Sequence, residues 1–382
     1  MALDFLKPLK KEILDFVKEL SSQHLGSKIV FHTKDDFPNI KKIKIAIIGV
    51  LENRGDPDAK YDVNLDFIRK ELYKLYPGNW NVSIADLGDL LKGDKIEDTY
   101  FALHKVTTFL VKNKVIPIII GGTQDLTYPL YRSYDDLEQM VNLVSIDSKL
   151  DLGKEEQNLS KNSYLSKIIV DEPNNLFNFS NIGYQSYFVP QEETDLIEKM
   201  FFDAYRLGEI SNSISIAEPL LREADLVSID LKSIKSSDSA NFNDFVPNGF
   251  SGKEICTLSR YAGISDKVSC VGIFNHNNTK QESVLIAQII WYFIEGIHFR
   301  TNEYPFSSKD NYIKYIVPID NDEIVFYKSD KSERWWMKIK NNLNPNNKNL
   351  KNSLISCSYE EYLLVINQEI PERWWKALKK YN

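Results

Sequence analysis

Residues 115–125 read VIPIIIGGTQD, an apolar run that ends in two glycines, an amide and an acid. Residues 141–151 read VNLVSIDSKLD and residues 226–232 read LVSIDLK, so two further apolar runs also end in acids. Short apolar runs of this kind are typical of strands that are buried on both faces of a parallel sheet. Because the carboxyl ends of parallel strands lie at one edge of the sheet, we expect these polar residues to converge there.

Strand-like and helix-like segments alternate along most of the chain. We expect strands at 43–50, 81–87, 115–120, 141–146, 226–229 and 268–274, and helices at 97–112, around 192–202, 218–224, 252–261 and 281–297. This alternation predicts an α/β fold in which helices cover both faces of a mostly parallel sheet, giving three α/β/α layers. The last helix is apolar nearly all round, which predicts an interior position.

Composition excludes several classes of protein. The apolar runs are all shorter than the roughly 20 residues that cross a bilayer, and the N-terminus lacks the apolar block of a secretory signal. We therefore expect a cytoplasmic protein. The net charge of −7 argues against a nucleic-acid partner. Cys256, Cys270 and Cys357 are far apart in sequence, which predicts buried thiols and no disulfide framework.

The acids at the strand ends have two explanations. Asp is common in loops and caps helices, and Asp125 stands directly before a Leu-Thr-Tyr-Pro segment that could begin a helix. Acids after three separate strands, however, favour a shared site at one edge of the sheet.

Taken in order, the three segments resemble the ligand motifs of the arginase superfamily: Gly-Gly-x-His-Asp, Asp-x-His-x-Asp and Ser-x-Asp-x-Asp. The resemblance runs from about Ile43 to Ile297 and is supported by Ala85-Asp86-Leu87-Gly88-Asp89 and by Val246-Pro247-Asn248-Gly249-Phe250. It is closest to the formimidoylglutamase-like branch. It implies an arginase-like domain at 41–300, after an N-terminal helical segment at 1–40.

The same resemblance implies six metal-ligand positions, of which this chain keeps three. Asp147, Asp151 and Asp230 are retained. Gln124 and Lys149 stand where the family has histidines, and Lys232 stands where it has an aspartate. The family's substrate-side histidine aligns with Ser163, and its late glutamate aligns with Asn275. The resemblance therefore implies a vestigial cleft lined by Gln124, Asp125, Ser163 and Asn275, with no residue to which a catalytic role is assigned.

A count that uses no alignment agrees with this interpretation. The histidines are His24, His32, His104, His276 and His298, so residues 105–275 contain none. Imidazole is the usual ligand and proton carrier in metal-assisted hydrolysis. Manganese would be the family cofactor if the protein were active, but we expect no cofactor.

A protonated lysine has no lone pair and cannot ligate a metal. We therefore predict that Lys149 and Lys232 replace the lost cations and form a buried charge cluster with Asp147, Asp151 and Asp230. The alternatives are that one or both lysines extend into solvent, or that the three acids hold one Mg²⁺ or Ca²⁺.

Residues 301–382 form an appendage of a different composition, rich in Asn, Lys and aromatic residues. Its sequence contains Glu-Arg-Trp-Trp at 333–336 and again at 372–375, and each copy predicts a short strand, a turn and a helix start. The small α+β appendage has two interpretations. Its tryptophans pack the appendage internally or onto the main domain, or they form a docking surface for another protein made of Arg334, Trp335, Trp336, Arg373, Trp374 and Trp375.

Three functions follow from these observations. The leading hypothesis is a metal-less arginase-fold pseudoenzyme that binds a protein partner or a small ligand. The second, implied by the resemblance, is a metal-dependent hydrolase that converts formiminoglutamate to glutamate and formamide. The third is a structural subunit that docks through the Trp-rich tail. The resemblance also implies a homo-oligomer.

Overall fold

The structure is a computed structural model that describes residues 2–59, 62–137, 139–153, 159–242, 245–303, 311–319, 322–339 and 353–381. Its centre is a sheet in the order β1-β4-β3-β5-β10-β9-β6-β7-β8, with β2 also paired to β4. The inner strands are β3 (Ile45–Val50), β4 (Ile84–Leu90), β5 (Ile116–Ile120), β6 (Val141–Ile146), β9 (Leu226–Asp230) and β10 (Cys270–Phe274). β7 (Leu176–Tyr184) and β8 (Asp203–Arg206) extend the sheet on one side. These eight strands pair in parallel.

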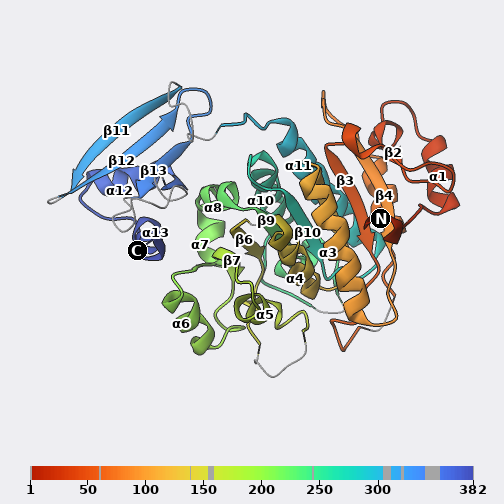
Figure 1. The fold of residues 1–382 in the computed structure, drawn as a ribbon, viewed down its shortest axis with the longest axis horizontal. Coiled ribbons are helices and arrows are strands. Elements are labelled where there is room, and N and C mark those ends of the chain that lie inside the picture. The colour runs from red at the N-terminus through yellow and green to blue at the C-terminus, as the bar shows by residue number, and fades with distance from the viewer. Residues whose placement is uncertain are drawn as a thin grey trace.

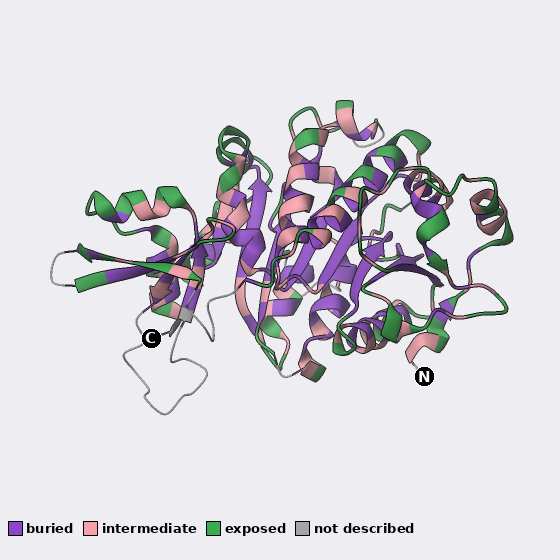
Figure 2. Cartoon of the chain, turned by 90° about the horizontal axis from the view of Figure 1, so that it is seen from above, coloured by how far each residue is buried: buried purple, intermediate pink, exposed green. Residues whose placement is uncertain are grey.

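Alternate residues of the strands divide the core into two halves. On β5, Ile118 and Ile120 pack with one cluster, and Ile119 packs with the other. The first half is covered by α1 (Lys11–Lys18), α2 (Asp66–Tyr73), α7 (Leu207–Asn212), α8 (Ala217–Glu223), α10 (Gly252–Ile264) and α11 (Lys280–His298). The second is covered by α3 (Ile96–Lys112), α4 (Thr127–Arg132), α5 (Tyr164–Val170) and α6 (Gln191–Lys199). The three predicted α/β/α layers are confirmed, as Figure 1 shows, and the buried sheet runs through the middle of Figure 2.

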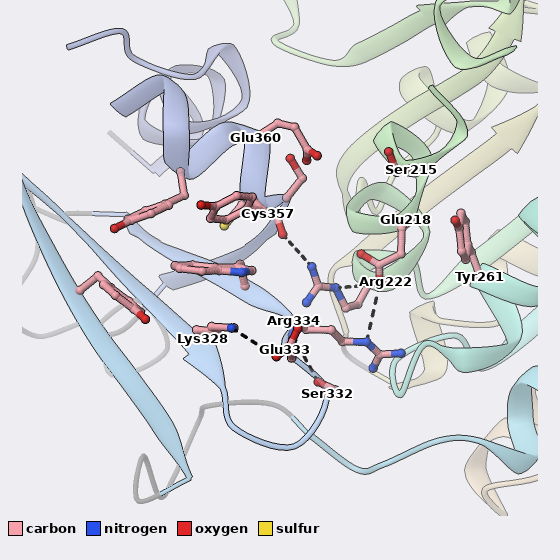
Figure 3. Close-up of a pocket in the computed structure, with 15 residues that line it drawn as sticks. Ser215, Glu218, Arg222, Tyr261, Lys328, Ser332, Glu333, Arg334, Cys357 and Glu360 are labelled. Atoms are coloured by element: carbon pink, nitrogen blue, oxygen red, sulfur yellow. Dashed lines mark hydrogen bonds and ion pairs between the residues drawn. The ribbon is translucent and has the colours of Figure 1, made fainter. Parts of the chain in front are cut away.

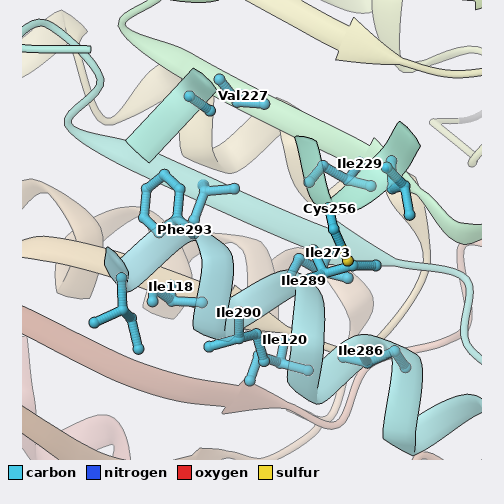
Figure 4. Packing of buried hydrophobic residues seen from close by; sticks show 14 of the residues in the cluster. Ile118, Ile120, Val227, Ile229, Cys256, Ile273, Ile286, Ile289, Ile290 and Phe293 are labelled. Carbon is cyan, nitrogen blue, oxygen red and sulfur yellow. The ribbon is translucent and has the colours of Figure 1, made fainter. Parts of the chain in front are cut away.

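Helix α11 is only partly the interior helix that its composition predicted. Ile286, Ile289, Ile290 and Phe293 are buried against strands β5, β9 and β10, as Figure 4 shows. Residues 281, 284, 288 and 292 form an exposed stripe with helical spacing, and the Val284 side chain is 41% exposed. The prediction was wrong on this face because apolar residues also occupy much of a normal protein surface.

The first 40 residues contribute to the central sheet as well as forming a helix. β1 (Leu6–Lys7) pairs antiparallel with β4, and β2 (Val30–Phe31) pairs with β4 in parallel. All three cysteines are buried and free, as predicted. In the described part of the chain, the helices are all too short or too polar to cross a membrane.

The appendage is a small α+β module. β11 (Tyr312–Ile319), β12 (Asp322–Ser329), β13 (Trp335–Ile339) and β14 (Ser353–Cys357) form an antiparallel sheet. Helices α12 (Tyr359–Ile366) and α13 (Glu372–Tyr381) pack on one face of it. Its other face meets the main domain, where β14 lies against α8 and the Trp336 ring faces Arg222. Residues 341–352, an Asn- and Lys-rich segment whose composition predicts a solvated loop, lie outside the described residues.

The two Glu-Arg-Trp-Trp copies adopt different structures, so the prediction of one shared strand-turn-helix unit was wrong. The first copy lies in the turn between β12 and β13 and begins strand β13. The second copy begins helix α13 directly after Pro371. Tertiary packing selects the conformation here, because aromatic residues suit a strand and a half-buried helix about equally.

Helix α13 also covers the start of the edge strand β8. Lys376 Nζ donates to the Phe202 carbonyl at 3.0 Å and lies 3.4 Å from the Asp203 carboxylate. The Lys380 ammonium lies 5.1 Å from the centre of the Phe202 ring. The module therefore contacts the main domain at α8, at the start of β8, and at Phe177 and Asn178 of β7.

Asp225 is buried at the amino ends of β6 and β9, the edge opposite the predicted site. Its carboxylate accepts from the Asn142 backbone N–H at 2.9 Å and from Gln139 Nε2 at 2.8 Å. Burial outweighs these bonds and raises the pKa of Asp225 to about 7. The folded protein therefore keeps a proton on Asp225 that the unfolded chain releases near pH 4.

Stability is expected to fall as the pH rises from about 4 to about 7, because the unfolded state ionises first. Asp225 contributes at most about 1.4 kcal/mol per pH unit to this slope. Urea denaturation at several pH values should therefore give a shallower slope for Asp225→Asn than for the wild type. Equal slopes would show that Asp225 ionises normally in the folded state.

Candidate functional site

The site is built on four neighbouring strands. β5, β10, β9 and β6 are adjacent in this order and run parallel, so their carboxyl ends share one edge of the sheet. Gln124 and Asp125 follow β5, Asn275 follows β10, Asp230 ends β9, and Asp147 follows β6. The predicted convergence of the strand ends is therefore confirmed.

Asp147, Asp151 and Asp230 form a buried group of acids. Their residues are 1%, 6% and 6% exposed. Burial, with repulsion from the other two carboxylates, raises the pKa of Asp147 well above its usual range. Burial and the charge of Asp230 raise the pKa of Asp151 to about 7, and burial raises the pKa of Asp230. These acids are close enough to repel one another, as expected for carboxylates gathered without full compensation.

Lys149 is placed differently from the prediction, whereas the charge of Lys232 lowers the pKa of Asp230. The Asp147 and Asp230 carboxylates accept from the backbone N–H groups of Lys149 and Lys232, at 2.9 and 2.8 Å. The Lys149 residue is exposed, and Lys232 is half-buried. The charge of Lys149 lowers the pKa of Asp151 and of Asp230, but this effect is smaller than the opposing effect of burial. The prediction that Lys149 is a buried counter-ion was therefore wrong. A long side chain at a strand end can turn outward, which the sequence does not reveal.

Lys149→Ala is expected to change the free energy of unfolding by less than about 1 kcal/mol, because an exposed ammonium is well solvated on its own. Thermal denaturation measures this, with Lys34→Ala as a control at another exposed lysine. A loss of about 3–5 kcal/mol for Lys149→Ala alone would restore the buried charge cluster.

Gln124 and Asp125 both point inward from the end of β5. Gln124 Nε2 donates to Ser145 Oγ at 3.3 Å and to Ser228 Oγ at 3.4 Å, so its amide lies between β6 and β9. Asp125 Oδ2 accepts from Tyr100 Oη at 2.6 Å, and burial raises the pKa of Asp125 to about 6. Asp125 is therefore not the helix cap that its sequence context allowed.

The other two cleft residues have different surroundings. Asn275 hydrogen-bonds with the Asp230 carboxylate and lowers its pKa, so Asn275 belongs to the acid cluster. Ser163 is buried at the start of α5, where its hydroxyl lies 2.9 Å from Ser160 Oγ. The backbone of α5 is joined to the acid loop because Leu165 N–H donates to the Asp151 carbonyl at 3.3 Å.

Glu282 is a further acid near the site that the strand-end argument missed. It lies in the first turn of α11, is 1% exposed, and accepts from the Asn277 N–H at 2.5 Å. Burial and the charge of Asp230 raise its pKa to about 7, whereas Lys232 lowers it. The sequence did contain a signal, because Thr279 and Glu282 have the spacing of a helix-capping pair. Glu282 instead turns back toward the loop after β10.

The strand-end site presents mainly carboxylate and amide oxygens as possible metal ligands. In the described ranges, His, Cys, Asp and Glu side chains form no group of three or more that could hold one ion. Gln124 Oε1, Asp125 Oδ1, Asn275 Oδ1 and Glu282 Oε1 are buried oxygens without a hydrogen-bond partner among the described residues. The edge of the sheet is thus rich in acceptors. Residues 105–275 contain no histidine, and the buried imidazole of His276 directly follows Asn275 at the end of β10.

The predicted docking residues are mostly buried. Trp335, Trp336 and Trp374 are 7%, 0% and 6% exposed, and Trp375 is 47% exposed. Arg373 pairs with Glu361 at 3.2 Å, and Arg334 lies 3.7 Å from Glu218 of the main domain. Three of the four tryptophans therefore pack inside the protein, and Trp375 is the one that is largely exposed.

A mostly parallel sheet with acids at the carboxyl ends of its central strands defines the chain as a three-layer α/β/α protein with a strand-end site. The chain belongs to the arginase family, whose sequence pattern matches residues 57–293, more than half of its length. A comparison with curated proteins gives no match.

Solved structures of similar fold include hydrolases of this family. Trypanosoma cruzi formiminoglutamase with Mn²⁺ is 16% identical, with a TM-score of 0.61 over 69% of this chain and 100% of that one. Formimidoylglutamase from Bacillus subtilis subsp. subtilis str. 168 is 14% identical, with a TM-score of 0.60 over 76% and 100%. Agmatine ureohydrolase of Thermoplasma volcanium is 16% identical, with a TM-score of 0.56 over 74% and 97%. Identities this low establish the fold alone.

Proposed function

We propose that this chain is a non-hydrolytic member of the arginase family that acts by binding a ligand or a partner. The observation that carries the proposal is the donor set at the strand ends. Two of its strand-end loops carry lysines, the β5 and β10 ends carry amides, and its acids include Asp147, Asp151, Asp230, Asp125 and Glu282. A hydrolase of the two-manganese type needs ligands that hold both ions and lower the pKa of a bound water.

The chemistry of the edge supports binding of a donor-rich ligand. Gln124, Asn275 and Glu282 each have a buried oxygen without a hydrogen-bond partner among the described residues, and a buried acceptor is stabilised by an N–H or O–H group. A small cation or amine would satisfy several of these oxygens at once. Asp151 and Glu282, whose pKa values are each about 7, would ionise as such a ligand bound.

Calorimetric titration of the full chain with Mn²⁺ tests the proposal. The wild type is expected to bind no stoichiometric pair of ions. The variant Gln124→His/Lys149→His/Lys232→Asp restores the family's ligand types at the same backbone positions and is expected to gain Mn²⁺ affinity. A matched variant, Gln124→Asn/Lys149→Gln/Lys232→Asn, removes the same side chains without adding ligands and should gain none.

Two Mn²⁺ ions bound to the wild type, together with hydrolysis of a formimino or guanidino substrate, would contradict the proposal. Failure of the restored variant to bind Mn²⁺, despite correct folding, would show that the loss of ligands is not what prevents metal binding.

The second candidate is a hydrolase of a linear amidine C–N bond that works with a reduced metal site. The mutually coupled acids Asp147, Asp151 and Asp230 favour it, because clustered carboxylates attract a cation. Release of formamide or urea from formimino and guanidino substrates, measured with and without added Mn²⁺, distinguishes the two functions.

A further inference from the structure

A cavity lies at the junction of the main domain and the C-terminal module. Its volume is about 720 Å³, which is in the usual range for small-molecule sites. Glu218 and Arg222 of α8 line one side, and Arg334 of the module lines the other (Figure 3). Trp335 and Tyr359 of the module line the cavity as well. The cavity is separate from the strand-end site, because α8 precedes β9 and lies at its amino end.

Arg222 is the central group of this cavity. It is 4% exposed, and its Nη2 donates to the Cys357 carbonyl at 2.9 Å. Its guanidinium carbon lies 4.6 Å from the centre of the Trp336 ring. Nε lies 3.3 Å from Glu218 Oε1, yet neither Nε nor Nη1 makes a hydrogen bond within the described residues. A guanidinium has five N–H donors, so a buried one needs more acceptors than this cavity supplies.

Arg222 and Arg334 share one carboxylate in the cavity. Arg334 Nε lies 3.7 Å from the same Glu218 Oε1 that faces Arg222, so one carboxylate serves two guanidinium groups. Burial lowers the pKa of Arg334, and Arg222 lowers it further against the opposing effect of Glu218. Lys328, nearer the mouth, has its own partner in Glu333 at 3.5 Å. Glu333 and Glu360, which also line the cavity, are exposed, so Arg222 and Arg334 share a single buried-side carboxylate, that of Glu218.

Aromatic side chains form much of the remaining wall. The Trp335 and Tyr362 rings are stacked at 4.5 Å between centroids, and Tyr315 lies 5.0 Å from Trp335. Tyr359 is 50% exposed beside them, and Tyr261 lines the side of the main domain. Flat apolar walls next to a buried cation match a ligand that has an aromatic ring and an anionic end.

We propose that this cavity binds a small aromatic carboxylate. Its carboxylate oxygens accept hydrogen bonds from Arg222 and Arg334, and its ring lies against Tyr359 and Trp335. A planar carboxylate matches the planar guanidinium groups, and it supplies acceptors to Arg222 Nε and Nη1, which make no hydrogen bond within the described residues. The ligand contacts the main domain and the module together, so its binding stabilises their association.

The test uses the full chain and benzoate, followed by calorimetry and by tryptophan fluorescence. Benzoate is expected to bind at millimolar concentration or below, and neutral benzamide is expected to bind at least about tenfold more weakly. Arg334→Gln should weaken benzoate binding by at least about tenfold, because it removes a charged donor. Lys331→Gln, which removes an exposed positive charge on the same turn, should leave the affinity unchanged.

A second variant tests the aromatic wall. Tyr359→Leu should weaken benzoate binding and leave the weaker binding of acetate unaltered, because only the ring of benzoate contacts this side chain. The proposal is overturned if benzamide binds as tightly as benzoate, if Arg334→Gln has no effect, or if benzoate does not bind. It is also overturned if inorganic phosphate binds more tightly than benzoate, since the site would then be one for a phosphate.

Discussion

Arg69→Met is expected to lower the free energy of unfolding by about 3–5 kcal/mol, because it leaves buried carboxylates without their partner. Arg69 is 2% exposed on α2, and it pairs with Asp86 at 2.9 Å and with Asp89 at 2.8 Å. Asp86 also accepts from Tyr73 Oη at 2.5 Å. The methionine side chain would fill the space but would donate no hydrogen bond. Urea denaturation of the purified protein measures the loss.

Lys10→Met is the matched control for Arg69→Met. Lys10 pairs with Asp66 at 2.8 Å, but its side chain is 53% exposed. Water solvates both charges there, so the expected loss is about 1 kcal/mol or less. Similar losses for the two variants would mean that the Arg69 network contributes little to stability despite its burial.

Trp336→Ala is expected to cost about 3–5 kcal/mol, the usual loss for a large aromatic side chain removed from a packed interior. The Trp336 residue is fully buried, packs edge-on against Tyr312 at 5.7 Å, and faces the Arg222 guanidinium. Its removal should therefore weaken both the module and the junction with α8. Denaturation followed by tryptophan fluorescence and by circular dichroism measures the two effects.

The second Glu-Arg-Trp-Trp copy supplies the control. Trp375 holds the same place in the repeated tetrapeptide as Trp336, but it is 47% exposed on helix α13. Trp375→Ala should change stability by about 0.5 kcal/mol or less, as surface substitutions usually do. A large loss at Trp375 would indicate that its ring is covered, for instance by a second copy of the chain.

The sequence predicted the central strands well because they are short, apolar and bounded by polar residues. The expected strand 141–146 matches β6, and 115–120 matches β5 within one residue. β7 was missed because Asn178, Ser180 and Asn181 interrupt its apolar pattern. Their polar side chains find partners inside the protein, as when Asn181 Nδ2 donates to the Lys149 carbonyl at 2.7 Å. Hydrogen-bond partners from other parts of the fold cannot be predicted from the periodicity of apolar residues in the sequence.

The strand-end acids could also be predicted, because parallel topology alone brings them to one edge. The outward direction of the Lys149 side chain could not be predicted, because side-chain rotamers depend on neighbouring residues whose positions the sequence does not give. Glu282 was missed because it reaches the site from a helix start. The cavity at Arg222 was also missed, because one of its walls belongs to a different module.

Strand β8 is the last strand of the central sheet, and helix α13 lies over its beginning through Lys376 and Lys380. An uncovered edge strand invites pairing with another chain. A chain shortened to end near Arg300 would thus present a bare edge and the Phe202 ring to its neighbours. In a binding experiment, self-association of that fragment would look the same as the loss of a partner protein. The C-terminal module therefore covers the edge of the central sheet in addition to containing the tryptophans.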